Sequence, residues 1–223
     1  MMLPWSDIDC VLLDMDGTLL DKRFDDDFWE EHVPEEVARR SGVPLHEVKQ
    51  RLYAEYRAAE GTLNWTDVDF WSKRFDLDIL SLKRDRIDRI GVHLDAIPFL
   101  EYLKRLKKRI ILATNAHPKV TEIKMSSTPL SAYFETMICS ADMGAPKEQD
   151  LFWRNAQERL GFDKQKTLFI DDTEAVLYAA EQFGIRFLLQ RTVTNAHRQI
   201  ATGRFTSLCC FSEIIDGDRP NPS

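Results

Sequence analysis

Two aspartates separated by one residue stand directly after an apolar segment near the start of the chain, residues 8–13. The five residues that follow this segment are Asp14, Met15, Asp16, Gly17 and Thr18. In extended backbone, residues i and i+2 point to the same side, so the two carboxylates face one small volume. Carboxylates this close repel each other unless a cation or a proton relieves the repulsion. The pattern therefore predicts a reactive or cation-binding site at the end of this segment.

Polar residues also follow two later apolar segments, and they are the next candidates for chemistry. Thr114 and Asn115 follow one segment, and Asp171 and Asp172 follow another. Ligands of open parallel sheets bind outside the carboxyl ends of the strands, so residues at those ends meet in one crevice. An adjacent pair of carboxylates offers the hard oxygen ligands that Mg²⁺ prefers.

These candidates depend on strands and helices that bring them together. Short segments rich in Val, Ile, Leu and Phe recur along the chain, and segments that are apolar throughout suit strands covered on both faces. They are residues 8–13, 110–113, 137–139, 168–170 and 185–189. Helical patterns lie between the later segments, at residues 97–106, 151–160 and 174–182. This alternation predicts an α/β fold with a doubly wound parallel sheet, built from right-handed βαβ crossovers.

The gap between the first and second predicted strands is far longer than one crossover helix needs. About 95 residues separate them, and apolar residues at steps of three and four predict an amphipathic helix over residues 45–59. Shorter helical patterns cover residues 34–40, 66–75 and 80–90. We therefore expect an all-helical cap domain at residues 25–92, inserted after the first strand of a core domain made of residues 1–24 and 93–223.

Charge and composition exclude some classes of function. The chain has 223 residues, with 30 Lys and Arg against 37 Asp and Glu, so its formal net charge is −7. A nucleic-acid-binding domain normally carries a basic stripe, so we expect no nucleic-acid partner. No apolar stretch approaches the ~18 residues of a membrane span and the start does not resemble a secretory signal, so we expect no membrane partner and a cytoplasmic location. Free thiols are expected at Cys10, Cys139, Cys209 and Cys210.

Taken together, these motifs resemble those of the haloacid dehalogenase (HAD) superfamily of phosphohydrolases. Four motifs of the superfamily have a counterpart here, in the expected order: residues 14–18, Thr114 with Asn115, Lys147 within Pro-Lys-Glu, and Asp171 with Asp172. The likeness covers nearly the whole chain. It implies a HAD-like Rossmannoid core, with the helical insertion as the cap.

The resemblance implies a role for each of these residues. Asp14 is expected to be the nucleophile that forms an aspartyl-phosphate. Asp16 is expected to protonate the leaving oxygen as a general acid and then to activate water as a base. Thr114, through its hydroxyl, and Asn115, through its backbone N–H, are expected to hold phosphate oxygens. Lys147 would supply positive charge to both the phosphate and Asp14.

Mg²⁺ is the cofactor that the resemblance implies. Asp172 would be a direct ligand, joined by the carboxylate of Asp14 and the main-chain carbonyl of Asp16, whereas Asp171 would bind the same ion or one of its ligands. Many members carry a further acidic residue four positions after the one that corresponds to Asp172, but Val176 occupies this position here. We therefore expect the adjacent pair to carry the whole of the metal binding that it would otherwise share with that further acid.

Within the superfamily, the chain looks most like enzymes that hydrolyse purine nucleoside 5′-monophosphates. This likeness is carried by residues 63–65, 97–101, 114–118 and 169–172. The expected substrate is a small phosphate monoester of the GMP or IMP kind, and the sequence is compatible with a monomer. Two alternatives stay open: a sugar-phosphate or phosphoglycolate phosphatase or phosphomutase with the same catalytic residues, and a non-catalytic phosphate-binding module. A halide leaves without a proton, so Asp16 argues against a dehalogenase.

Three further features of the sequence have structural explanations. The acidic residues 25–27 are expected to stabilise a helix N-terminus through the helix dipole. Aromatic residues of the predicted cap could stack on a purine, but aromatic residues at helical spacing more often form a core. They are Trp29, Trp65, Phe70 and Trp71. His117 lies three residues after Thr114, and we expect it to have a structural role.

Overall fold

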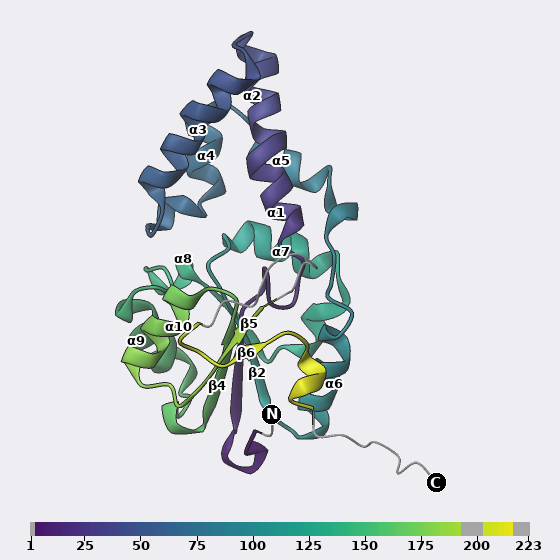
Figure 1. The fold of residues 1–223 in the computed structure, drawn as a ribbon, viewed down its shortest axis with the longest axis vertical. Helices are drawn as coiled ribbons and strands as arrows, with labels where there is room; N and C mark the ends of the chain where they lie inside the picture. The colour runs from purple at the N-terminus through teal and green to yellow at the C-terminus, as the bar shows by residue number, and fades with distance from the viewer. Residues whose placement is uncertain (1–2, 193–202, 216–223) are drawn as a thin grey trace.

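The structure is a computed structural model, and it describes residues 3–192 and 203–215. A sheet of six strands lies in its lower part, in the order β3–β2–β1–β4–β5–β6 (Figure 1). The strands are β1 (Cys10–Leu13), β2 (Arg109–Thr114), β3 (Thr136–Cys139), β4 (Thr167–Asp171), β5 (Phe187–Arg191) and β6 (Ser207–Leu208). Each strand is parallel to its neighbours, so the carboxyl ends of all six lie at the same edge.

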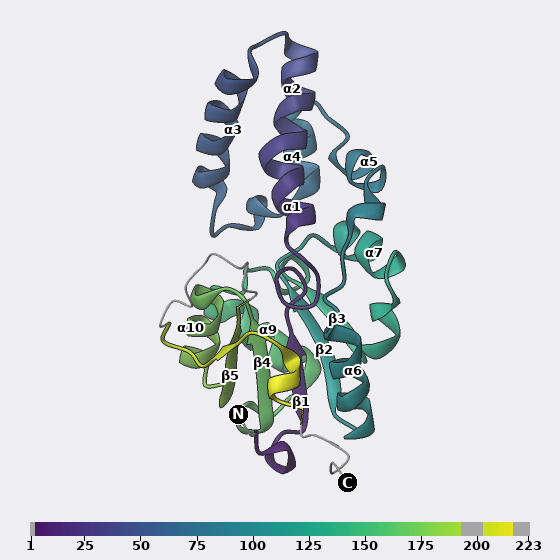
Figure 2. The same ribbon diagram turned by 45° about the vertical axis from the view of Figure 1, so that its right-hand side comes forward.

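Helices cover both faces of this sheet (Figures 1 and 2). One side carries α6 (Ala96–Arg105) and α7 (Pro118–Ser126), and the other carries α8 (Ser140–Met143), α9 (Asp150–Leu160) and α10 (Glu174–Phe183). The side chains of β1 alternate between two apolar clusters, with Val11 and Leu13 in the first and Cys10 and Leu12 in the second. Because the strand is buried on both faces, it is apolar throughout. The predicted α/β class with a doubly wound parallel sheet is confirmed.

A second group of helices lies beyond the carboxyl edge of the sheet, in the chain segment between β1 and β2 (Figure 1). It consists of α1 (Arg23–Asp27), η2 (Phe28–His32), α2 (Val33–Ser41), α3 (Leu45–Ala59), η3 (Leu63–Trp65), α4 (Val68–Phe75), α5 (Ile79–Arg84) and η4 (Ile87–Arg89). We call this segment, residues 23–89, the cap. Its apolar side chains form a cluster around Phe28, Leu52 and Trp71. The helical insertion after the first strand is thus confirmed, and the domain boundaries at residues 25 and 92 stay a prediction.

Several elements differ from the expectations, among them β1, which begins at Cys10 rather than at residue 8, and α7, which is not expected. The helical pattern at residues 80–90 divides into α5 and η4, because the first helix ends at Asp85. The fifth strand begins two residues later than expected, because Ile185 completes the turn after Gly184 and donates its N–H to the carbonyl of Ala180. Strand β6 is not expected, because a strand of two residues leaves no periodic pattern in the sequence.

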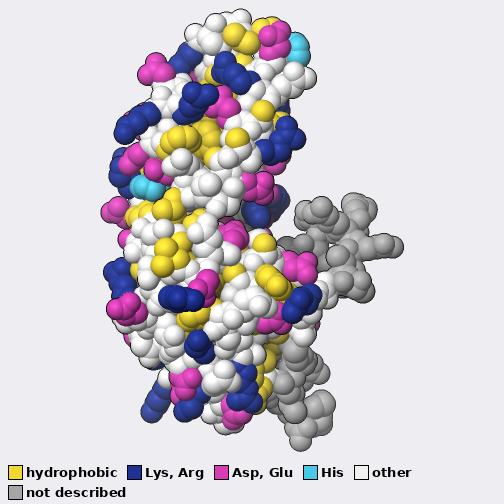
Figure 3. Space-filling view, turned by 90° about the vertical axis from the view of Figure 1, so that its left-hand side faces the viewer, with side chains coloured by type: hydrophobic (Ala, Val, Ile, Leu, Met, Phe, Trp, Pro, Cys, Tyr) yellow, Lys and Arg dark blue, Asp and Glu magenta, His cyan; other side chains and the backbone are white. Residues whose placement is uncertain are grey.

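The next features are the distribution of charged side chains on the surface and the state of the four cysteines. On the face drawn in Figure 3, Lys and Arg side chains are intermixed with Asp and Glu over both the cap and the core. All four cysteines are free; Cys10 and Cys139 are buried, and Cys209 and Cys210 are partly exposed. Within residues 3–192 and 203–215, no helix combines the length and the apolar character that crossing a membrane requires.

Truncating a core side chain of the central strand tests how tightly this sheet is packed. Leu12 is fully buried in β1, between β2 and β4. We expect Leu12→Ala to lower the free energy of unfolding by about 2–5 kcal/mol, because it leaves a cavity in a packed interior. Leu94 is 98% exposed, so Leu94→Ala should change this free energy by less than about 0.5 kcal/mol. Urea denaturation measures both, and equal losses would contradict the packing described here.

Candidate active site

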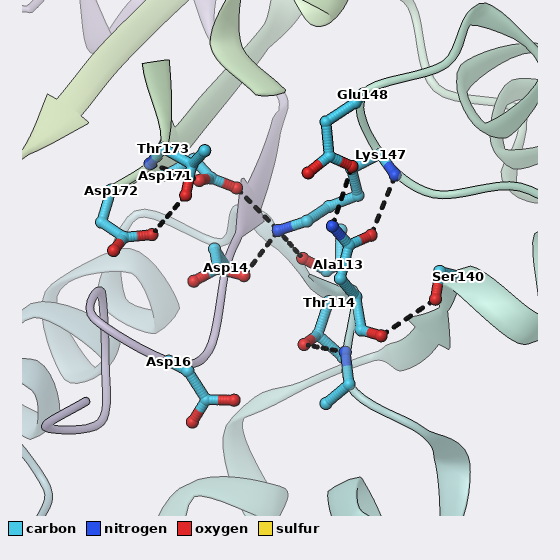
Figure 4. Close-up of polar contacts among 12 residues, drawn as sticks. Asp14, Asp16, Ala113, Thr114, Ser140, Lys147, Glu148, Asp171, Asp172 and Thr173 are labelled. Carbon is cyan, nitrogen blue, oxygen red and sulfur yellow. Dashed lines mark hydrogen bonds and ion pairs between the residues drawn. The ribbon is translucent and has the colours of Figure 1, made fainter. Parts of the chain in front are cut away.

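A lysine between two carboxylates forms the centre of the site, at the carboxyl edge of the sheet (Figure 4). Lys147 Nζ lies 2.5 Å from Oδ1 of Asp14 and 2.6 Å from Oδ2 of Asp171. It also donates to the main-chain oxygen of Ala113 at 3.1 Å. Asp14 directly follows β1, and Asp171 ends the neighbouring strand β4, so the pairing of these strands delivers both carboxylates. All three charged side chains are buried, which is tolerated because they are paired and hydrogen-bonded.

Hydrogen bonds from two directions hold the main chain of Lys147. Its N–H donates to Oδ1 of Asn115 at 2.9 Å, and its carbonyl accepts from the indole N–H of Trp153 at 2.7 Å. Nδ2 of Asn115 donates to Glu148 at 2.9 Å, and the hydroxyl of Ser140 donates to the main-chain oxygen of Asn115 at 2.9 Å. The Asn115 side chain therefore fixes the loop that carries Lys147, which we call the lysine loop. The sequence predicts a role only for the backbone N–H of Asn115, so this role of its side chain is an addition.

Three carboxylates meet beside this lysine. Asp14, Asp171 and Asp172 each offer an oxygen atom, and these atoms lie within 4.8 Å of one another. Oδ2 of Asp14 is buried and has no hydrogen-bond partner in the described part of the chain. Asp172 is less buried, and its Oδ2 accepts from Lys22 at 3.1 Å. Oxygen ligands clustered around an unpartnered carboxylate oxygen fit a divalent cation such as Mg²⁺.

Burial, together with the excess of negative charge, controls protonation at this centre. Burial raises the pKa of Asp14 to about 7; the charge of Lys147 opposes this shift, and the charges of Asp171 and Asp172 add to it. Burial also raises the pKa of Asp171. For Lys147, burial acts to lower the pKa, but the carboxylates of Asp14 and Asp171 raise it above its usual value, so the amine stays charged. A second cation at the three carboxylates would return their pKa values toward the ordinary range.

Asp16 lies apart from these three carboxylates. Its side chain points away from the carboxylate of Asp14 (Figure 4), and its Oδ1 accepts from Nζ of Lys124 in α7 at 2.6 Å. Burial raises the pKa of Asp16 to about 6, and the charge of Lys124 opposes this shift. A group with a pKa near neutrality is suited to exchange protons with a reacting oxygen.

The turn after β1 depends on Gly17. Its φ of +87° lies in the left-handed region that favours glycine, and its N–H donates to the carbonyl of Leu20 at 2.7 Å. A Cβ at this position would lie 2.4 Å from Oδ2 of Asp172. Only glycine therefore lets the turn pass this close to the acid pair.

Thr114 and His117 stand where β2 leads into α7. The hydroxyl oxygen of Thr114 accepts from the N–H of Ala116 at 3.0 Å, which leaves its proton available to an anion. His117 is the N-cap of α7, and its Nδ1 accepts from the N–H of Lys119 at 3.3 Å. The structure thus gives His117 a capping role.

One cavity of about 750 Å³ joins these residues to the cap. Its core side contains all of the predicted site residues: Asp14, Asp16, Thr114, Asn115, Lys147, Asp171 and Asp172. Its cap side contains the aromatic residues Trp29, Tyr53, Tyr56, Trp65 and Trp71. The expectation of a core role is correct for Trp71, which is buried, and wrong for Trp65, which is 41% exposed at the cavity.

Two lysines beside this cavity, Lys83 and Lys124, are absent from the sequence expectations. Lys124 contacts Asp25 as well as Asp16, and Lys83 donates to the other oxygen of Asp25 at 2.6 Å. Asp25 lies in the first turn of α1, as expected of an acidic residue at a helix N-terminus, and its two lysine contacts are an addition to that role. Burial acts to raise the pKa of Asp25, but Lys124 and Lys83 hold it below its usual value. The paired residues lie 58 and 99 positions apart, so no local pattern reveals these contacts.

Known proteins resemble this chain over most of its length. A sequence profile of haloacid dehalogenase-like hydrolases matches residues 8–184. The GMP/IMP nucleotidase YrfG of Escherichia coli (strain K12) is 42% identical over 203 residues, which cover 91% of this chain and 90% of that protein.

Solved structures share the fold. A HAD phosphatase from Thermococcus onnurineus superposes with a TM-score of 0.79 at 25% identity, over 92% of this chain and 95% of its own. CbbY from Rhodobacter sphaeroides, solved in complex with phosphate, has a TM-score of 0.66 at 16% identity, over 92% of this chain and 96% of its own. Because the profile, the relative and the fold agree with the acids gathered at the strand ends, the chain belongs to the haloacid dehalogenase-like hydrolases.

Proposed function

We propose that the protein is a Mg²⁺-dependent phosphomonoesterase that hydrolyses purine nucleoside 5′-monophosphates through an aspartyl-phosphate on Asp14. The observation that carries this proposal is the state of the Asp14 carboxylate. One oxygen is held by Lys147, and the other is buried among acids that line the cavity and has no hydrogen-bond partner among the residues that the structure describes. A carboxylate fixed in this way is positioned to attack a phosphorus atom beside a cation.

The chemistry can be written with the residues around the cavity. A carboxylate oxygen of Asp14 attacks phosphorus, and the bond from phosphorus to the 5′ oxygen breaks while Asp16 gives its proton to that oxygen. Asp16 then takes a proton from water as the water oxygen attacks phosphorus. This second step breaks the bond to Asp14 and releases inorganic phosphate. Lys147, the Thr114 hydroxyl and the Asn115 backbone N–H hold the other phosphate oxygens.

The metal site of this proposal uses the carboxylates of Asp14, Asp171 and Asp172, with the main-chain carbonyl of Asp16. When bound, Mg²⁺ supplies positive charge that stabilises the transferring phosphoryl group. The support is the unpartnered Oδ2 of Asp14 within the carboxylate cluster. The acid pair also has no third carboxylate four residues on, since Val176 is buried there.

The purine preference rests on the cap side of the cavity and on the relative that is a GMP/IMP nucleotidase. Trp65 offers an exposed ring, and aromatic rings bind bases by stacking. Arg57 and Glu60, at the end of α3, also line the cavity. A carboxylate and a guanidinium complement the N1–H and O6 of a 6-oxopurine, whereas adenine presents the opposite donor and acceptor pattern.

A panel of phosphate esters tests the proposed function. We expect release of phosphate from GMP and IMP in preference to AMP, ribose 5-phosphate and phosphoglycolate, and only with Mg²⁺ present. Asp14→Asn should lower kcat on the order of 10⁴-fold or more while the circular dichroism spectrum stays unchanged. Hydrolysis of sugar phosphates alone would favour the sugar-phosphate phosphatase instead. Full activity of the Asp14 variant would exclude this residue as the nucleophile.

The pKa of Asp14 predicts how Mg²⁺ binding depends on pH. Because burial raises this pKa to about 7, the metal-free folded state favours the protonated acid, and this contribution to stability is lost as pH rises through about 7. Mg²⁺ requires the ionised form, so its stabilising effect grows in the same range. We expect saturating Mg²⁺ to raise Tm clearly more at about pH 8 than at about pH 5. If Mg²⁺ raised the Tm of Asp14→Asn and of the wild type by the same amount at both pH values, Asp14 would not be the group that controls Mg²⁺ binding.

Removing the exposed ring of the cap tests base recognition. We expect Trp65→Ala to raise KM for GMP by about 5- to 150-fold, because stacking of a base on an aromatic ring is worth about 1–3 kcal/mol. KM for ribose 5-phosphate, which has no base, should stay unchanged. Leu45 is an exposed apolar residue of α3 that does not line the cavity, so Leu45→Ala is the matched control. Equal effects of Trp65→Ala on both substrates would show that this ring does not contact the base.

A further inference from the structure

A chain of four alternating charges runs from Asp16 into the cap. Nζ of Lys124 lies 2.6 Å from Oδ1 of Asp16 and also contacts Oδ2 of Asp25, and Nζ of Lys83 lies 2.6 Å from Oδ1 of Asp25. Lys124 belongs to α7 of the core, whereas Asp25 and Lys83 belong to α1 and α5 of the cap. Asp16, the acid of the proposed reaction, is thereby connected to the cap by direct contacts.

The two lysines of this chain are almost completely withdrawn from solvent, whereas the two aspartates are partly exposed at the cavity. The side chains of Lys124 and Lys83 are 1% and 2% exposed, and those of Asp16 and Asp25 are each 21% exposed. Burying an ion pair costs several kcal/mol per ion, and the attraction between the ions often does no more than offset that cost. A gain in stability therefore does not explain why two lysines are buried here. The need to hold Asp16 in place does explain it.

We propose that Lys124, held by Asp25 of the cap, is the residue that positions Asp16 for proton transfer to the leaving oxygen. Lys124 is the one side-chain partner of the Asp16 carboxylate in the described part of the chain, and it holds Oδ1. The other oxygen, Oδ2, then stays available to carry and give the proton. The inference rests on the proposed phosphomonoesterase reaction, in which Asp16 is the acid.

The cap takes part because Asp25 fixes the far side of the Lys124 amine. Without Asp25, Lys124 keeps its contact with Asp16 but loses the contact that orients the amine. A docked cap therefore completes the placement of the acid. The same helix offers an internal comparison, because Lys119 in α7 also bridges core and cap, with its Nζ 2.6 Å from Asp69 of α4. Lys119 has no contact with Asp16, so it connects the cap to the core without positioning the acid.

The experiment compares two leaving groups. GMP and ribose 5-phosphate release an alkoxide that needs a proton, whereas p-nitrophenyl phosphate releases a phenolate that leaves without one. General acid catalysis contributes about 10²- to 10⁴-fold, and this factor applies to the alkoxide esters only. The measured quantity is the ratio of kcat/KM for an alkoxide ester to kcat/KM for p-nitrophenyl phosphate. Because kcat/KM reports the first phosphoryl transfer, the later action of Asp16 as a base on water does not affect this ratio.

We expect Lys124→Met to lower kcat/KM for the alkoxide esters at least about tenfold more than for p-nitrophenyl phosphate. Asp25→Asn keeps the shape of the side chain, and it should shift the ratio in the same direction by a smaller factor. Asp16→Asn removes the acid itself, so the change that it causes in the ratio is the largest one expected. Lys119→Met should leave the ratio unchanged, because it removes a tie between cap and core that does not reach Asp16.

The alternative outcomes are distinct. Equal losses for both kinds of ester in Lys124→Met and Asp25→Asn would give these residues a structural role and overturn the inference, as would an unchanged ratio. A shift of the ratio in Lys119→Met equal to that in Asp25→Asn would assign the effect to cap docking and also overturn it. If wild-type enzyme hydrolyses ribose 5-phosphate but no nucleotide, the purine proposal fails and the ratio is measured with ribose 5-phosphate. Hydrolysis of no ester at all would overturn the proposed function and this inference together.

Discussion

The structure depends on one amine held between two buried carboxylates. Lys147 reaches Asp14 and Asp171 at once only because β1 and β4 are adjacent and in register, and because Asn115 at the end of β2 holds the lysine loop. The arrangement of the sheet and the chemistry of the site are therefore a single constraint. Lys147 and the more exposed Lys22 together do not balance three acids, and the remaining negative charge makes the site suitable for a metal ion.

Much of the core could be predicted from the sequence because a buried parallel strand leaves two local signals. It is apolar throughout, and a polar residue follows where it meets the ligand edge. Asp14, Thr114 and Asp171 stand at such ends, and all three line the cavity. The boundaries of β5 and the separation of α5 from η4 escape this reasoning, because hydrogen bonds of the turns decide them.

The contacts between cap and core could not be predicted in this way. Asp25, Lys83 and Lys124 each look like an ordinary charge on the surface of a helix, and only the packing of distant helices buries them together. Trp65 and Trp71 are of the same residue type and six positions apart, yet one is exposed at the cavity and the other is in the cap core. Residue type and spacing indicate the family of hydrolases, whereas the proposed substrate choice and the proposed placement of the acid depend on tertiary contacts.

The crowding at Gly17 has a consequence for how this enzyme can diversify. Any substitution there brings a side chain into the Asp172 carboxylate and also demands a backbone conformation that other residues rarely adopt. Position 17 therefore does not tolerate substitution, and the turn after β1 must keep its glycine. Laboratory evolution toward new substrates would have to act on the cavity wall of the cap, where Trp65 and Arg57 are exposed.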